Sequence, residues 1–96
     1  NEKKSYKSVG IFPSPFRIPN DKPLTIDGLK DNSSIKIMTL SGEVLRSIPN
    51  SEFQGYQAYW DGRDQSGKLV GTGVYLVAIY DKNGASSFEK VAVIRE

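Results

Sequence analysis

The sequence contains no cysteine and no histidine. Without cysteine there is no disulfide framework, and the redox compartment cannot be inferred from thiols. Without histidine the chain lacks the usual general base at neutral pH, the commonest metal ligand and every catalytic triad that depends on an imidazole. We therefore predict that the chain is not an enzyme, with no catalytic residue, no metal site and no cofactor.

Long apolar runs and a basic stripe are missing as well. No segment approaches the roughly 20 apolar residues that cross a bilayer, and the N-terminus has no signal-peptide pattern. The net charge is only +2, and apart from a short cluster at Lys3, Lys4 and Lys7 the basic residues are scattered among acidic ones. Nucleic-acid binders carry a concentrated basic surface. We expect neither nucleic-acid binding nor direct insertion into a membrane.

The composition that remains is typical of one small folded domain. The 96 residues are 38% apolar and 25% charged, far from the composition of a disordered chain. A core of two packed layers suits this length. The polar residues 1–8 are predicted to be a linker and residues 9–96 a domain. Because the first residue is Asn1 rather than methionine, the chain is expected to be part of a longer protein.

Seven short extended segments follow one another, and no window holds a helical period with caps. The segment from Val74 to Tyr80 is apolar on both faces, which predicts a central strand covered on both sides. Prolines around Ser14 predict an extended edge segment, because proline lacks the ladder donor. The seven segments are residues 9–12, 24–29, 34–40, 43–49, 56–60, 74–80 and 86–95.

Turn signals separate most of these segments. Ser41-Gly42 and the run from Asp81 to Gly84 are typical of tight hairpins, since glycine and asparagine accept positive φ. Regular turns between short strands predict an all-β fold, a seven-stranded antiparallel sandwich of the immunoglobulin-like or fibronectin III-like type. In it Trp60 is expected in the core, and the turn residues are Gly42, Asp61, Gly62 and Gly67.

Two groups of residues suggest binding chemistry, and each has a structural explanation. The run from Asp61 to Gly67 resembles a short calcium loop, but its acids are three apart and apolar residues follow where further ligands belong. Paired turns explain it better. Tyr56, Tyr59 and Trp60 suggest a platform for a sugar ring, whereas a core position explains Trp60 better. Tyr56 and Tyr59 differ in parity, so a regular strand directs them to opposite faces.

Four motifs, in order, resemble a family of bacterial C-terminal modules. Residues 11–16 resemble a "YPNPF" opening, and residues 35–46 resemble a "V-x-I-Y-D-L-S-G-E-L-V-R" hairpin. Residues 60–75 are similar to "WDGRDxxGxxVxxGVY", the signature of the immunoglobulin-like domain of flagellar hook-capping proteins and of many extracellular proteins of Bacteroidetes. Residues 88–95 resemble the closing "K-x-x-V-I-R" strand of type IX secretion sorting domains of type A. Ser14 and Thr39-Leu40 depart from the family pattern.

The resemblance implies a non-enzymatic sorting and surface-anchoring signal at the C-terminus of a secreted bacterial protein. Its partners would be components of a secretion translocon or a surface peptidase, with passenger domains N-terminal in the same chain, and it would be secreted or located at the cell surface. A structural spacer or assembly module, as in hook-capping proteins, and a carbohydrate-binding accessory module remain open. The recognition residues implied by the resemblance are Gly73, Val74, Tyr75, Lys90, Val91, Ala92, Val93, Ile94 and Arg95.

Overall fold

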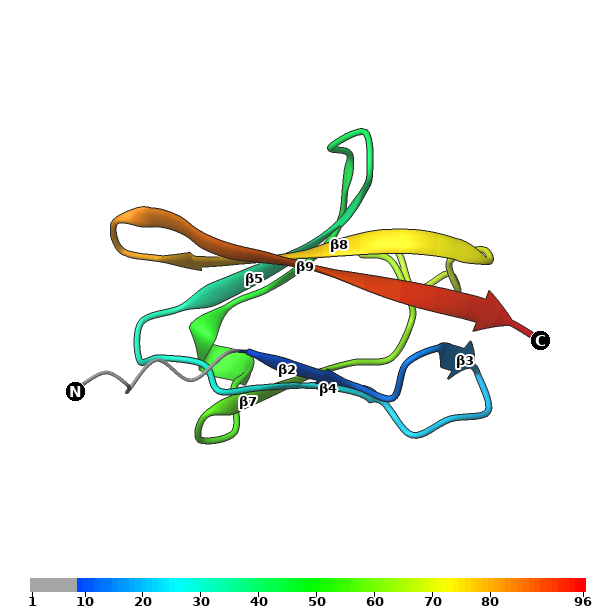
Figure 1. Cartoon of the computed structure of the whole chain (residues 1–96), viewed down its shortest axis with the longest axis horizontal. Helices are drawn as coiled ribbons and strands as arrows, with labels where there is room; N and C mark the ends of the chain where they lie inside the picture. Colours follow the sequence, from blue (N-terminus) through cyan, green and yellow to red (C-terminus); the bar gives the residue numbers. More distant parts are fainter. Residues whose placement is uncertain (1–8) are drawn as a thin grey trace.

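The structure, a computed structural model, describes residues 9–96, with the side chains of residues 85 and 86 set aside. In this range eight strands form a three-stranded sheet, β2-β4-β7, and a five-stranded sheet, β3-β9-β8-β5-β6. The two sheets make two layers (Figure 1). The elements are β2 (Gly10–Phe12), β3 (Phe16–Ile18), β4 (Leu24–Asp27), β5 (Ser34–Thr39), β6 (Val44–Ile48), the 3-10 helix η1 (Asn50–Glu52), β7 (Gln57–Trp60), β8 (Gly73–Asp81) and β9 (Gly84–Arg95).

The predicted all-β class is confirmed, and the core between the two sheets follows from the period of two in each strand. Along β4, β5 and β7, every second side chain points inward and is excluded from solvent. These inward residues are Leu24, Ile26, Ile35, Ile37, Ala58 and Trp60, each no more than 1% exposed. The predicted linker, residues 1–8, lies outside the described residues.

Trp60 lies at the centre of this core. Its ring packs against Phe16 at a centroid distance of 5.9 Å and meets the edge of Tyr75 at 6.3 Å. The indole Nε1–H donates a 2.9 Å hydrogen bond to the carbonyl oxygen of Arg63. Truncating a buried aromatic side chain of this kind costs about 3–5 kcal/mol. One residue of the smaller sheet therefore ties together both sheets and the loop that follows it.

Two details of the predicted fold are wrong. The count of seven strands missed β3, and the sheets are not wholly antiparallel, because β3 pairs in parallel with β9, placing Phe16 opposite Val93. The cause is the proline-rich segment 13–15, which carries the chain from the edge of one sheet to the edge of the other. There Phe16 and Ile18 are each 1% exposed, so two buried side chains hold a very short strand in place.

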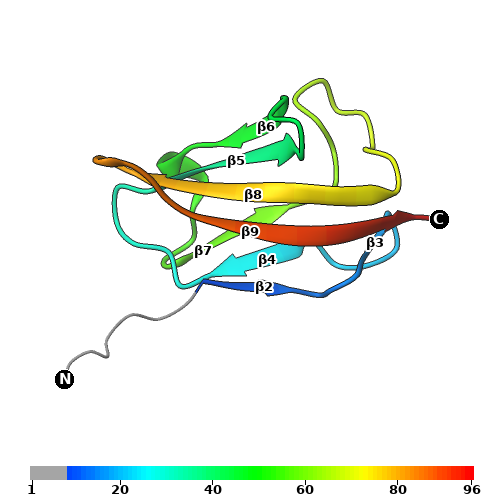
Figure 2. The ribbon, with the colours of Figure 1, turned by 45° about the horizontal axis from the view of Figure 1, so that its top comes forward.

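The prediction for β8 is right about its position and wrong about its cover. The strand lies between β9 and β5, inside the larger sheet (Figure 2). Its inward residues Val77 and Ile79 are buried, but on the outer face Val74 is 44% exposed. The second layer covers only one face of this sheet, so some apolar side chains on the other face meet solvent, although Ala78 on that face is 0% exposed. On the neighbouring strand β9, Phe88 pairs with Ala78 of β8, and its side chain is 54% exposed on the same outer face.

Candidate functional site

The two segments implied as recognition elements lie side by side. Gly73 pairs with Val93, Val74 with Ala92, and Tyr75 with Val91, all in the ladder between β8 and β9. Their side chains divide between two environments. Val91 and Val93 are 1% exposed and belong to the core, so a partner cannot contact them on the folded domain. The predicted recognition residues that a partner could reach are the exposed Val74, Lys90, Ala92 and Arg95 and the half-buried Gly73, Tyr75 and Ile94.

The backbone of β9 offers a second kind of contact. β8 pairs with β9 from Gly84 to Val93, whereas on the other side β3 pairs only with residues 93–95. Among the strands that the structure describes, none pairs with this second edge before Val93. The Glu96 amide donates to Ile18 of β3 at 2.9 Å, and the Arg95 amide faces the other way, donating to Thr72 Oγ1 at 3.0 Å.

This alternation shows which backbone groups are available. In a regular antiparallel ladder successive residues direct their N–H and C=O groups to opposite sides. The register of β8 with β9 is regular from Val93 back to Ser87. Phe88 and Lys90 have the parity of Glu96, so their backbone groups point to the open edge. An extended peptide can add to such an edge as a further strand.

The final residue is held by the fold. Besides the amide bond to Ile18, the Glu96 carboxylate forms a 3.5 Å ion pair with Arg17 and a hydrogen bond with the side-chain amide of Asn20. Both partners of the ion pair are exposed, so it contributes little to stability. Its effect is geometric. It holds Glu96 against β3, so the end of the chain lies away from the part of the β9 edge that has no partner strand.

The loop predicted as a pair of turns uses its carboxylates for turn hydrogen bonds. Asp64 Oδ1 accepts from the Ser66 amide at 2.9 Å, the Ser66 hydroxyl at 2.7 Å and the Lys68 amide at 3.0 Å. Asp61 Oδ1 accepts from the Arg63 amide at 3.1 Å. The Ser66 hydroxyl and the Lys68 amide lower the pKa of Asp64. A lowered pKa is the opposite of what a general acid needs.

The same loop covers the edge of β6. The Gln65 amide donates to the carbonyl oxygen of Leu45 at 2.8 Å, and Gln65 Oε1 accepts from the Ser47 amide at 3.0 Å. Beside it, Arg46 lies 3.5 Å from Asp61 Oδ1. Gln65 thus acts as a one-residue strand that satisfies outward groups of β6, a common protection for an exposed edge. Sequence reasoning missed this role, because a glutamine in a turn carries no signal of what it will cover.

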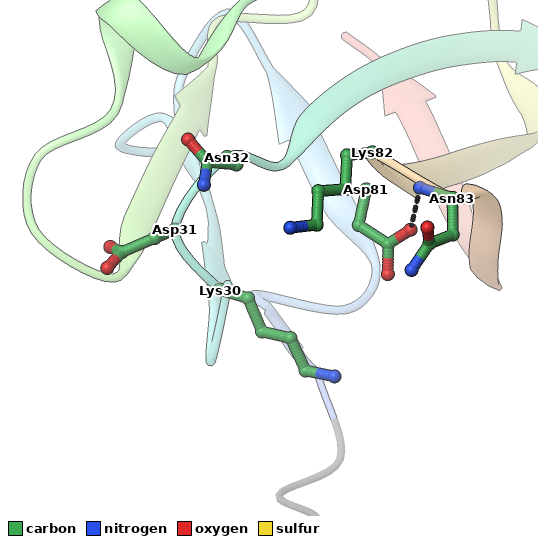
Figure 3. Close-up of a pocket in the computed structure, with 6 residues that line it drawn as sticks. All are labelled: Lys30, Asp31, Asn32, Asp81, Lys82 and Asn83. Carbon is green, nitrogen blue, oxygen red and sulfur yellow. Dashed lines mark hydrogen bonds between the residues drawn. The ribbon is translucent and has the colours of Figure 1, made fainter.

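A hollow of about 140 Å³ lies at one end of the sandwich. Figure 3 shows residues 30–32 of the β4–β5 connection facing residues 81–83 of the β8–β9 hairpin. Two lysines, Lys30 and Lys82, lie near two aspartates, Asp31 and Asp81, so the charges balance. Asp81 is already engaged, since its Oδ1 accepts from the Asn83 amide at 2.8 Å. The hollow shows no excess charge that would select an ion.

Residues 9–96 lack the features of a metal site and of a membrane-spanning helix. No group of three or more acidic, histidine or cysteine residues comes together there as a metal site would require. Nor does this part of the chain contain a helix long and apolar enough to cross a bilayer. The features that stand out are the paired strands β8 and β9, their outer apolar side chains and the open edge of β9.

Comparison with known proteins gives a specific structural match. No family model and no curated protein sequence matches the chain. Among solved structures, PorZ of Porphyromonas gingivalis, described as an essential bacterial surface component of the type IX secretion system, superposes with a TM-score of 0.73 and 32% identity over 91% of this chain. Dimeric latent PorU of the same organism superposes at 0.64 and 24% identity over 92% of it, which shows the fold alone.

These proteins are much longer than this chain. It corresponds to 11% of the PorZ chain and 9% of the PorU chain. The match is therefore to one domain-sized part of each protein. It supports the resemblance to type IX secretion modules that the sequence motifs indicated. That recognition is confirmed: this chain is a two-sheet β domain similar to one carried by PorZ, a surface component of the type IX secretion system.

Proposed function

We propose that this domain is a non-enzymatic sorting and surface-anchoring module of an exported protein, with the immunoglobulin-like sandwich as the form that the export machinery reads. The likeness to PorZ over 91% of the chain supports a role within type IX secretion. Under this proposal the passenger lies N-terminal in the same protein, the module is secreted or held at the cell surface, and its partners are translocon or surface-peptidase components.

The observation that carries the proposal is the open edge of β9. Among the strands of residues 9–96, this twelve-residue strand is paired on one side almost throughout and on the other only at residues 93–95. Proteins normally protect long edges, and this domain does so at β6 with Gln65. An unprotected stretch at the opposite edge of the same sheet suits a partner that binds by strand addition. Lys90 and Val74 next to it would supply side-chain contacts.

The structure also shows why deletion is a poor test. Removing residues 90–96 takes Val91 and Val93 out of the core, so lost export would not separate recognition from folding. Lys90→Pro is sharper. It removes one outward N–H that a docked strand would use, and proline is tolerated at edge positions whose N–H faces solvent. Lys90→Ser is the matched control, because it removes the same side chain and keeps the N–H.

The experiment fuses the whole chain to a periplasmic reporter in a bacterium with a functional type IX system. We expect Lys90→Pro to reduce surface delivery at least tenfold and Lys90→Ser to reduce it less than threefold. Purified variants are first compared by thermal unfolding, to verify that Lys90→Pro is folded at the growth temperature. Equal delivery by the folded Lys90→Pro variant and the wild type would refute edge recognition and favour a structural spacer.

A further inference from the structure

The outer face of the three-stranded sheet, on the far side of the molecule from β8, carries an ordered set of side chains that the sorting proposal does not use. The ladders place Phe12 opposite Thr25 and Thr25 opposite Tyr59, so these three form one row across β2, β4 and β7. Gly10, Asp27 and Gln57 form the next outward row, two positions along each strand. We call these six residues the β2-β4-β7 face.

The first row presents two separated aromatic rings. Phe12 is 50% exposed and Tyr59 is 38% exposed, so both rings are accessible to a ligand. One strand lies between them, so their backbones are about 9–10 Å apart by the ordinary spacing of strands. The smaller side chain of Thr25 lies between them. The Phe12 ring leans over Gly10, where a Cβ would come within 3.8 Å of it.

The second row is a connected set of hydrogen bonds. The Tyr59 hydroxyl donates to Gln57 Oε1 at 2.6 Å, and Gln57 Nε2 donates to Asp27 Oδ1 at 3.1 Å. This chain of bonds fixes the Tyr59 ring and orients the glutamine before any ligand arrives. It leaves the second oxygen of Asp27, one amide hydrogen of Gln57 and the lone pairs of the Tyr59 hydroxyl available to a ligand.

A hollow adjoins the face beside Phe12. It has a volume of about 410 Å³ and is open to solvent, which is within the usual range for small-molecule sites. Pro13 and Pro23 give it rigid apolar walls, and Asp21 and Lys22 contribute one charge of each sign. One carboxylate oxygen of Asp21 already accepts a 2.8 Å hydrogen bond from the Arg17 amide. The hollow lies where β2 ends and β4 begins, and Phe12 and Thr25 of the first row form part of its lining.

The chemistry of this face selects among ligands. Aromatic rings with a negatively polarised face attract C–H groups, and carboxylate, amide and hydroxyl groups beside them bind hydroxyls. Asp27 would repel an anionic ligand, and the balanced charges of Asp21 and Lys22 offer no excess to attract one. A pyranose ring combines an apolar C–H face with hydroxyls at its rim. We propose that the β2-β4-β7 face binds an uncharged oligosaccharide across Phe12, Thr25 and Tyr59.

The test uses the whole chain and a panel of soluble neutral hexasaccharides, namely cello-, xylo-, manno- and laminari-hexaose, measured by isothermal titration calorimetry. We expect at least one to bind, and Tyr59→Ala and Phe12→Ala each to weaken that binding at least tenfold. Tyr59→Phe keeps the ring and removes the hydroxyl, so a loss of about threefold is expected. An anionic probe, oligogalacturonate, should bind at least tenfold more weakly than the best neutral sugar.

Two matched controls separate this site from general stickiness. Tyr56→Ala removes a tyrosine that is 68% exposed but outside the face, and Phe88→Ala removes an aromatic that is 54% exposed on the other sheet. Both should leave binding within twofold of the wild type. The proposal is overturned if no neutral sugar binds, if oligogalacturonate binds best, or if Tyr56→Ala costs as much as Tyr59→Ala. None of these outcomes bears on export, which the sorting proposal assigns to the opposite sheet.

Discussion

Single residues decide how the Asp61–Gly67 loop packs on the sandwich, and Gly62 is the clearest case. Its φ is +84°, and an added Cβ would lie 2.7 Å from the Cγ2 of Ile18, a core residue that is 1% exposed. Gly67 has a similar φ of +92°, with nothing within 4 Å of an added Cβ. Comparing substitutions at these two glycines, which are five residues apart, therefore separates the effect of backbone strain from that of steric conflict.

We predict that Gly62→Ala lowers the free energy of unfolding by about 2–4 kcal/mol, through the cost of positive φ together with overpacking against Ile18. Gly67→Ala should cost about 1–2 kcal/mol, from the backbone term alone. Urea unfolding followed by Trp60 fluorescence measures both. Equal losses for the two variants would contradict the steric part of this account.

Asp64 gives a prediction that depends on pH. Its pKa is lowered from 3.8, first by the Ser66 hydroxyl and then by the Lys68 amide. Because the folded pKa lies below the unfolded one, the charged form stabilises the fold above the unfolded pKa, and this stabilisation is lost as pH falls through the folded pKa. Asp64→Asn should therefore melt at a lower temperature than the wild type at pH 7.

The difference in melting temperature between Asp64→Asn and the wild type should narrow as the pH falls below 3.8, which calorimetry at a series of pH values measures. Asp61→Asn is the control, because this aspartate has fewer turn hydrogen bonds, a 3.1 Å bond from Arg63 and a long contact with Arg46. If the difference in melting temperature between Asp64→Asn and the wild type stays constant from pH 7 to pH 2, charge on this carboxylate does not stabilise the loop.

At the scale of elements, the two long edges of the five-stranded sheet are treated differently. β6 is covered by Gln65, through its backbone amide and its side-chain oxygen. β9 is left open before Val93 among the described residues. Unpaired strand edges associate with one another. If the open edge of β9 serves a partner, uncovering the edge of β6 should therefore create a second binding edge and promote unwanted association.

We predict that Gln65→Ala has two effects. Loss of the side-chain bond to the Ser47 amide lowers the free energy of unfolding by about 0.5–1.5 kcal/mol. The uncovered β6 edge also raises self-association, which analytical ultracentrifugation detects as a larger share of dimers or higher species at the same concentration. Gln54→Ala, at another exposed glutamine, should change neither property. Unchanged sedimentation of Gln65→Ala would show that this edge does not need its cover.

At the scale of the whole molecule, the domain presents two chemically distinct sheet surfaces on opposite sides of one core (Figures 1 and 2). The five-stranded sheet shows apolar side chains such as Val74 and Phe88 and the open edge of β9. The three-stranded sheet shows Phe12, Tyr59 and a polar row. A domain of this size has no room for a deep enclosed site, so its function depends on surfaces and edges.

The sequence alone determined the class and much of the strand pattern. Alternation in β4, β5 and β7 identified buried positions such as Ile35 and Trp60, because a strand buries every second side chain whatever its partners. The turn glycines and the Asp81–Gly84 hairpin were equally local, since they depend on backbone conformation at single residues. The family resemblance came from motifs that are continuous in the chain.

Only the tertiary structure decided what depends on residues far apart in the sequence. β3 is too short to be predicted, and it exists because Phe16 and Ile18 are buried beside Val93, some 77 residues further along the chain. The exposure of one face of β8, the cover that Gln65 gives to β6 and the alignment of Phe12 with Tyr59 likewise follow from strand order and register. Those are set by packing between sheets, which no local pattern of residues contains.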